Sequence, residues 1–206
     1  MIWEHSAPTR KDPNSWKDNM KALGSFKTVE GFWQYFNHIP KPASVFYTME
    51  AGRKCFSGGK MVEEYSLFKK GIEPEWGDPE NRIGGEFYTR GNMEPDQLNA
   101  YWQNLVFAVV GEYLESSMST CGGCDKVTQN HEDGCVVCNC CCKNIVNGVR
   151  VVDKSKQYPM YKLELWLNTK NADVKDRLRA RLNEVVVDSV PAPRKGHPSF
   201  DWKDHS

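Results

Sequence analysis

Three of the seven tryptophans occupy positions where an indole could bind a flat ligand. Trp16 and Trp76 lie in polar, turn-rich segments, where a large aromatic side chain is not easily a core residue. Proteins use such aromatics to stack on nucleobases. Trp166 follows Lys162 by four residues in an alternating segment, and on a strand such side chains share a face, about 13 Å apart. This pair suits a ligand with phosphates at one end and a ring at the other, although an ordinary surface strand would give the same pattern.

A second group of candidate ligands lies in the cysteine-rich segment 120–142. Two CxxC pairs separated by ten residues are formed by Cys121, Cys124, Cys135 and Cys138. Four thiolates with this spacing can close a tetrahedral zinc site, with His131 and residues 140–142 as further candidate ligands. The alternative is a reduced, cysteine-rich loop without metal. A structural zinc ion is therefore a candidate, and the sequence indicates no required cofactor.

The composition limits the classes of partner. Lys plus Arg equals Asp plus Glu, at 27 each, so the formal net charge is zero. This balance argues against sequence-blind binding to duplex nucleic acid, which needs many phosphate contacts, but a local basic cluster could hold a small phosphorylated ligand. No signal-peptide pattern and no apolar run of transmembrane length is present, so we expect a cytoplasmic protein without membrane contact. Disulfides are not expected in that compartment, which favours metal binding by the cysteines.

Hydrophobic periodicity predicts three helices and several strands. The expected helices cover residues 29–39, 95–113 and 171–186, and the expected strands cover residues 65–68, 85–89, 145–152 and 162–168. Residues 40–62 and 120–142 interrupt the pattern and are expected to be insertions, the first of them a loop. Residues 194–206 resemble a polar tail. The mixed order of elements favours an α+β fold in a single domain spanning residues 1–206.

Four parts of the sequence resemble the eukaryotic translation initiation factor 4E family, which binds the cap of messenger RNA. They are Trp16 with residues 26–39 (FKTVEGFWQYFNHI), residues 65–85 (YSLFKKGIEPEWGDPENRIGG), residues 101–112, and Arg150 with Lys162 and Trp166. The spacing within residues 65–85 matches the family without a gap. The resemblance implies a curved antiparallel sheet backed by three long helices. The insertions at residues 40–62 and 120–142 suggest a divergent paralogue of the protist type.

The resemblance also implies a role for each candidate residue. Trp16 and Trp76 should stack on the two faces of a 7-methylguanine base, whose positive charge adds cation–π attraction. Arg150 and Lys162 should hold the phosphates of the cap, because a guanidinium donates parallel hydrogen bonds to phosphate. Trp166 should flank the methyl group at the wall of the pocket.

One departure from the family concerns the edge of the guanine. Family members carry a glutamate where this chain has Gly77, and that carboxylate accepts hydrogen bonds from the base. Asp78 is the nearest replacement, with Glu75 and Glu80 as weaker candidates, but Asp78 could instead cap the following turn. Without a carboxylate the buried donors of the base go unpaired, and the affinity should fall. Phe87 replaces a family tryptophan and is expected in the core.

The family docks partner helices on its helical, dorsal face, and the matching residues here are Val29, Trp33 and Phe107. A helix-in-groove interface is therefore expected, with a scaffold initiation factor of the 4G type or a 4E-binding regulatory protein as partner. Core packing would explain the same apolar residues. Gln103 and Asn104 replace an apolar–acidic pair of the family, so the partner preference should be altered.

These observations predict a binding protein and not an enzyme. Its ligand would be capped messenger RNA, a hypermethylated cap included, and its process translation initiation. Three alternatives stay open at this point: a cap-binding translational repressor, a zinc-dependent RNA-processing enzyme, and a protein-interaction module whose cap pocket has decayed. The loss of a carboxylate at Gly77 motivates the third.

Overall fold

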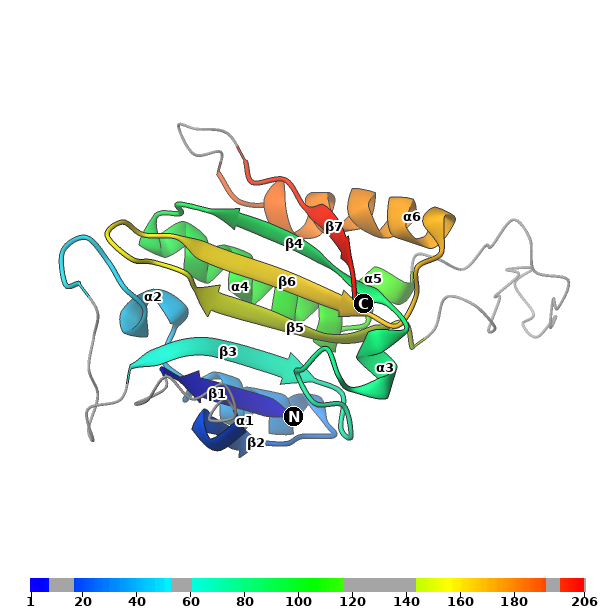
Figure 1. Ribbon diagram of the computed structural model, residues 1–206, viewed down its shortest axis with the longest axis horizontal. Helices are drawn as coiled ribbons and strands as arrows, with labels where there is room; N and C mark the ends of the chain where they lie inside the picture. The colour runs from blue at the N-terminus through cyan, green and yellow to red at the C-terminus, as the bar shows by residue number, and fades with distance from the viewer. Residues whose placement is uncertain (8–16, 53–60, 117–143, 192–196, 206) are drawn as a thin grey trace, which may run out of the picture.

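A computed structural model describes residues 1–7, 17–52, 61–116, 144–191 and 197–205 of the chain. These residues form a curved, seven-stranded antiparallel sheet in the order β2-β1-β3-β5-β6-β4-β7. Helices α1, α4 and α6 lie behind the sheet in Figure 1. The strands are β1 Ile2–Ser6, β2 Met20–Gly24, β3 Val62–Phe68, β4 Gly85–Gly91, β5 Val146–Asp153, β6 Tyr161–Leu167 and β7 Asp201–Asp204. The helices are α1 Val29–Phe36, α2 Pro42–Val45, α3 Pro79–Arg82, α4 Pro95–Val110, α5 Tyr113–Ser116 and α6 Ala172–Leu182.

The three predicted long helices are confirmed, although α1 ends at Phe36 and α4 at Val110, each three residues before the predicted end. The starts of α1 and α4 follow from local chemistry. The Thr28 side chain accepts a hydrogen bond from the Gly31 N–H at 3.1 Å, which satisfies an otherwise unpaired donor in the first turn of α1. Pro95 begins α4, where its missing N–H removes no helical hydrogen bond. The third helix differs from the prediction in its last turn, because α6 continues into a π-helical turn, Asn183–Val187.

Strict alternation along β6 gives the sheet two different faces. Leu163, Leu165 and Leu167 are fully buried in the core between sheet and helices. The intervening residues Glu164 and Trp166 point to the opposite face, because successive strand residues alternate. This opposite face carries the polar side chains, and the candidate site is built on it.

The predicted polar tail is wrong for its described part. Residues 201–204 form β7, which pairs antiparallel with β4, so that Glu86 lies opposite Lys203 and Gly85 opposite Asp204. The backbones approach closely here: a Cβ at Gly85 would lie 2.4 Å from the Lys203 carbonyl oxygen. His205 follows β7 and is buried. The backbone pairing with β4 holds this segment in place, and a strand of four mainly polar residues carries no periodic signal.

The described part of segment 40–62, predicted as a loop, contains the short helix α2. Its Ala43 and Val45 are buried, and the following Phe46 stacks on Tyr65 of β3 and Tyr161 of β6. This stretch therefore contributes to the core. In the described ranges, no helix is long and apolar enough to span a membrane.

Candidate functional site

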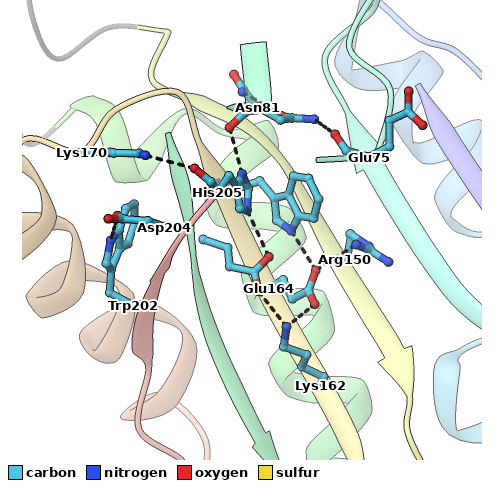
Figure 2. A network of polar contacts seen from close by, with 12 residues as sticks. Glu75, Asn81, Arg150, Lys162, Glu164, Lys170, Trp202, Asp204 and His205 are labelled. Atoms are coloured by element: carbon cyan, nitrogen blue, oxygen red, sulfur yellow. Dashed lines mark hydrogen bonds and ion pairs between the residues drawn. The ribbon is translucent and has the colours of Figure 1, made fainter. Parts of the chain in front are cut away.

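The register of three strands gathers charged residues on the face of the sheet away from the helices. Arg150 of β5 lies opposite Glu164 of β6, and Glu86 of β4 lies opposite Trp166. Lys162 shares this face because it is two residues from Glu164 on the same strand. Figure 2 shows the resulting network.

Arg150 and Lys162 are both paired with carboxylates on this face. Arg150 forms a two-pronged contact with Glu64 of β3, in which Nε donates to Oε1 at 2.9 Å, and its third nitrogen lies 3.3 Å from Glu164. The Lys162 ammonium lies 2.6 Å from Glu164 and 2.7 Å from Glu86. The three carboxylates are buried. Two cations therefore face three carboxylates, which together form what we call the ion cluster.

The pKa values in the ion cluster reflect this pairing. Burial alone would lower the pKa of Arg150 and of Lys162, but the neighbouring carboxylates outweigh it and raise both. Burial alone would raise the pKa of Glu86. The hydrogen bonds and charges of His205 and Lys162 outweigh that effect and bring the pKa of Glu86 to about 2. Glu86, Arg150 and Lys162 thus stay ionised at neutral pH.

His205 connects the ion cluster to the loop that carries Trp76. Its Nδ1 lies 2.9 Å from the Asn81 carbonyl oxygen and its Nε2 lies 3.2 Å from a Glu86 carboxylate oxygen. Both atoms that it faces are acceptors, so the ring makes both hydrogen bonds only when both nitrogens carry protons. The ring centre lies 4.4 Å from that of Trp166, and the His205 carbonyl accepts a hydrogen bond from Lys170.

Trp76 projects from a firmly held loop before α3. It is 49% exposed, and its ring centre lies 6.2 Å from that of His205. The ammonium of Lys203 lies 4.1 Å from the centre of its ring. Asn81 donates hydrogen bonds to the carbonyl oxygens of Glu73 and Glu75, which fixes the loop around the indole. Trp76 is therefore a preset aromatic surface beside the ion cluster.

Two predicted residues have surroundings that differ from the expectation. Trp166 is fully buried, and its Nε1 donates to Glu164 at 2.8 Å, so here His205 covers it and it does not line an open pocket. The two Asp78 carboxylate oxygens accept the backbone N–H groups of Glu73 and Glu80, both at 2.9 Å. This geometry favours the capping role that the sequence left as the alternative for Asp78.

Several predicted ligands lie outside the described residues. They are Trp16, Cys121, Cys124, Cys135 and Cys138. Within the ranges that the structure describes, no group of three or more His, Cys, Asp or Glu side chains is placed to hold a metal ion. The second stacking tryptophan and the zinc site thus stay predictions.

The residues that sequence reasoning missed are mainly acidic. Glu64, Glu86 and Glu164 pair with the predicted phosphate ligands. Glu164 had a signal, because it lies between Lys162 and Trp166 on their shared face. Glu64 and Glu86 reach the site only through the register of strands far apart in the sequence. Phe87, as predicted, is a buried core residue.

On the helical face, two of the three predicted docking residues lie at a groove of about 340 Å³. Trp33 is 39% exposed and lines it with Phe107, whose ring centre lies 5.2 Å away, while Val29 is exposed on the first turn of α1. Gln103 also lines the groove. Asn104 turns aside and donates to Ser189 Oγ at 2.9 Å.

Comparison with known proteins places the chain in a family. The sequence model described as "Eukaryotic initiation factor 4E" matches residues 1–205. The chain belongs to the eukaryotic initiation factor 4E family. Drosophila melanogaster eukaryotic translation initiation factor 4E1 is 33% identical over 109 residues, which are 52% of this chain and 37% of that protein. The chain thus spans well under half of that relative's length.

Solved structures show the same fold. Ascaris suum eIF4E-3 in complex with an m2,2,7G cap superposes with a TM-score of 0.64 at 24% identity, over 100% of this chain and 87% of that one. Caenorhabditis elegans eIF4E-3 bound to the 4E-binding protein Mextli superposes with a TM-score of 0.64 at 24% identity, over 97% of this chain and 88% of that one. The curved sheet and its helices agree with the sequence prediction. The family model is described as an initiation factor, which agrees with the prediction of a binding protein.

Proposed function

We propose that this chain binds the 7-methylguanosine cap of messenger RNA and acts in translation initiation. Family membership supports this function, as do the cap and the Mextli partner named for the two nematode proteins. The observation that carries the proposal is the half-exposed Trp76 indole, which already holds the Lys203 ammonium on its ring. His205 lies between this indole and the ion cluster that contains Arg150 and Lys162.

The proposed binding mode follows from these contacts. The methylated base carries a positive charge, so it stacks on Trp76 with cation–π attraction, with Trp16 on its other face. The phosphates of the cap then replace the carboxylates of the ion cluster as the partners of Arg150 and Lys162. Because Trp166 is covered by His205, the His205 ring must move before the base reaches Trp166.

The test is a titration followed by tryptophan fluorescence. Wild-type protein is titrated with 7-methylguanosine triphosphate and with plain guanosine triphosphate, beside Trp76→Ala. We expect quenching that favours the methylated nucleotide and is lost in Trp76→Ala. Tyr158→Ala, which removes a more exposed aromatic from the turn between β5 and β6, is the control and should bind as wild type does. Equal quenching by both nucleotides in wild type would refute selective cap recognition.

The groove on the helical face supports a partner in the same proposal. We propose that a scaffold initiation factor or a 4E-binding regulator lays a helix against Trp33 and Phe107. Gln103 in that groove favours the second candidate function, a cap-binding repressor with a different partner. Affinity capture with wild type and Trp33→Ala separates the two: loss of a 4G-type scaffold supports initiation, and loss of a regulator alone supports repression.

A further inference from the structure

Lys203 occupies a position that the proposed function leaves unexplained. It lies on β7 directly opposite Glu86, and its ammonium reaches the Trp76 ring at 4.1 Å from the centre. Glu86 is taken by Lys162 and His205. Among the residues that the structure describes, no carboxylate forms an ion pair with Lys203, so the aromatic ring is its recorded partner there.

A cation on an indole changes what else that indole attracts. The face of the ring is attractive to positive charge because of its quadrupole. If a base stacks on the face that Lys203 covers, the base must displace the ammonium. If it stacks on the opposite face, the ammonium draws electron density away from it. In both arrangements a cationic base gains less from Trp76 than it would from an uncovered indole, whereas a neutral base stacks mainly by dispersion and loses little.

We propose that Lys203 determines how strongly the site discriminates a cationic, N7-methylated purine from a neutral purine. Its ammonium competes with the charge of the base for Trp76 and so lowers the selectivity for methylation. This inference rests on the proposed function, because it concerns the same ligand site. It makes the C-terminal strand a part of that site and assigns Lys203 a specificity-determining role.

The test measures the dissociation constants of 7-methylguanosine triphosphate and guanosine triphosphate by calorimetry. Lys203→Met keeps the length of the side chain and removes its charge. We expect the selectivity ratio to rise by about two- to fivefold, the range of cation–π attraction at exposed sites, through tighter binding of the methylated nucleotide. Lys203→Arg keeps the cation and should leave the ratio near that of wild type.

Two further proteins make the test specific. Lys175→Met removes an ammonium that lies 4.8 Å from the ring centre of Trp202, a matched cation–π contact outside the site, and should change neither constant. The double variant Lys203→Met with Trp76→Ala should have the same selectivity ratio as Trp76→Ala alone, because the effect of Lys203 acts through the indole.

The outcomes separate the two proposals. If wild type prefers the methylated nucleotide and Lys203→Met shows the same ratio, the inference is wrong and cap binding stands. Weaker binding of both nucleotides by Lys203→Met would also overturn the inference, since it would mean that Lys203 holds the phosphates. If wild type binds neither nucleotide but Lys203→Met binds the methylated one, the inference is supported. Failure of every variant to bind either nucleotide would overturn both.

Discussion

Glu86 should make the fold sensitive to acid in a defined pH range. Its carboxylate has no solvent exposure and accepts hydrogen bonds from Lys162 at 2.7 Å and from His205 at 3.2 Å. These partners bring its pKa from 4.5 to about 2. Between those values the unfolded chain binds more protons than the native one, so the stabilisation is complete above pH 4.5 and is lost as the pH falls toward 2. The difference corresponds to about 3 kcal/mol of unfolding free energy.

The assay is urea unfolding at a series of pH values between 7 and 2.5. Glu86→Gln should be less stable than wild type at pH 7, because the charge of Lys162 loses a buried partner. Below pH 4.5 the difference in unfolding free energy between the two proteins should shrink by about 3 kcal/mol, because the Glu86 carboxyl of wild type titrates and the amide of the variant does not. Glu50→Gln removes an exposed carboxylate and should follow wild type throughout. Parallel curves for wild type and Glu86→Gln would refute the assignment of the acid sensitivity to Glu86.

Three other predictions concern glycines and cysteines. Gly84→Ala should lower the unfolding free energy by about 1–3 kcal/mol, because the new Cβ would meet the Leu167 carbonyl oxygen at 1.8 Å; Gly77→Ala, with nothing within 4 Å of its Cβ, is the control. Gly77→Glu should tighten binding of 7-methylguanosine triphosphate by about tenfold through hydrogen bonds to the guanine edge, and equal tightening of 7-methylinosine triphosphate, which lacks the amine, would contradict that. Elemental analysis should find stoichiometric zinc in the wild-type protein and none in Cys121→Ser with Cys138→Ser; a metal-free wild type would leave the cysteine segment as a plain loop.

The elements that the sequence predicted well are those with a strong period. In the helix that begins after Thr28, apolar residues recur with the helical period over two turns. In the strand that contains Trp166, apolar and polar residues alternate over several residue pairs. The alternation also placed Lys162 and Trp166 on one face, which the structure confirms. The same alternation puts Glu164 between them, so part of the charge pairing was available from the sequence.

The rest depends on pairing between distant strands. Nothing local indicates that Glu64 meets Arg150, which is 86 positions further along the chain. Likewise, β7 is short and polar, and its place is set by hydrogen bonds to β4 and by the burial of His205. Interactions of this kind are specified by register, which a single sequence expresses only through turn geometry and the pattern of buried faces.

The ion cluster also constrains how a phosphate ligand can enter the site. Arg150 and Lys162 are not available to a phosphate without rearrangement, because each already forms ion pairs with two carboxylates. Protonation of Glu86 does not free Lys162 at neutral pH, because Lys162 and His205 lower the pKa of that carboxyl to about 2. In the proposed binding mode, the phosphates therefore replace carboxylates by movement of side chains, and the repulsion between phosphate and any carboxylate that stays offsets part of the gain. For this reason stacking on Trp76, and the charge of Lys203 beside it, should weigh heavily in the selectivity of the site.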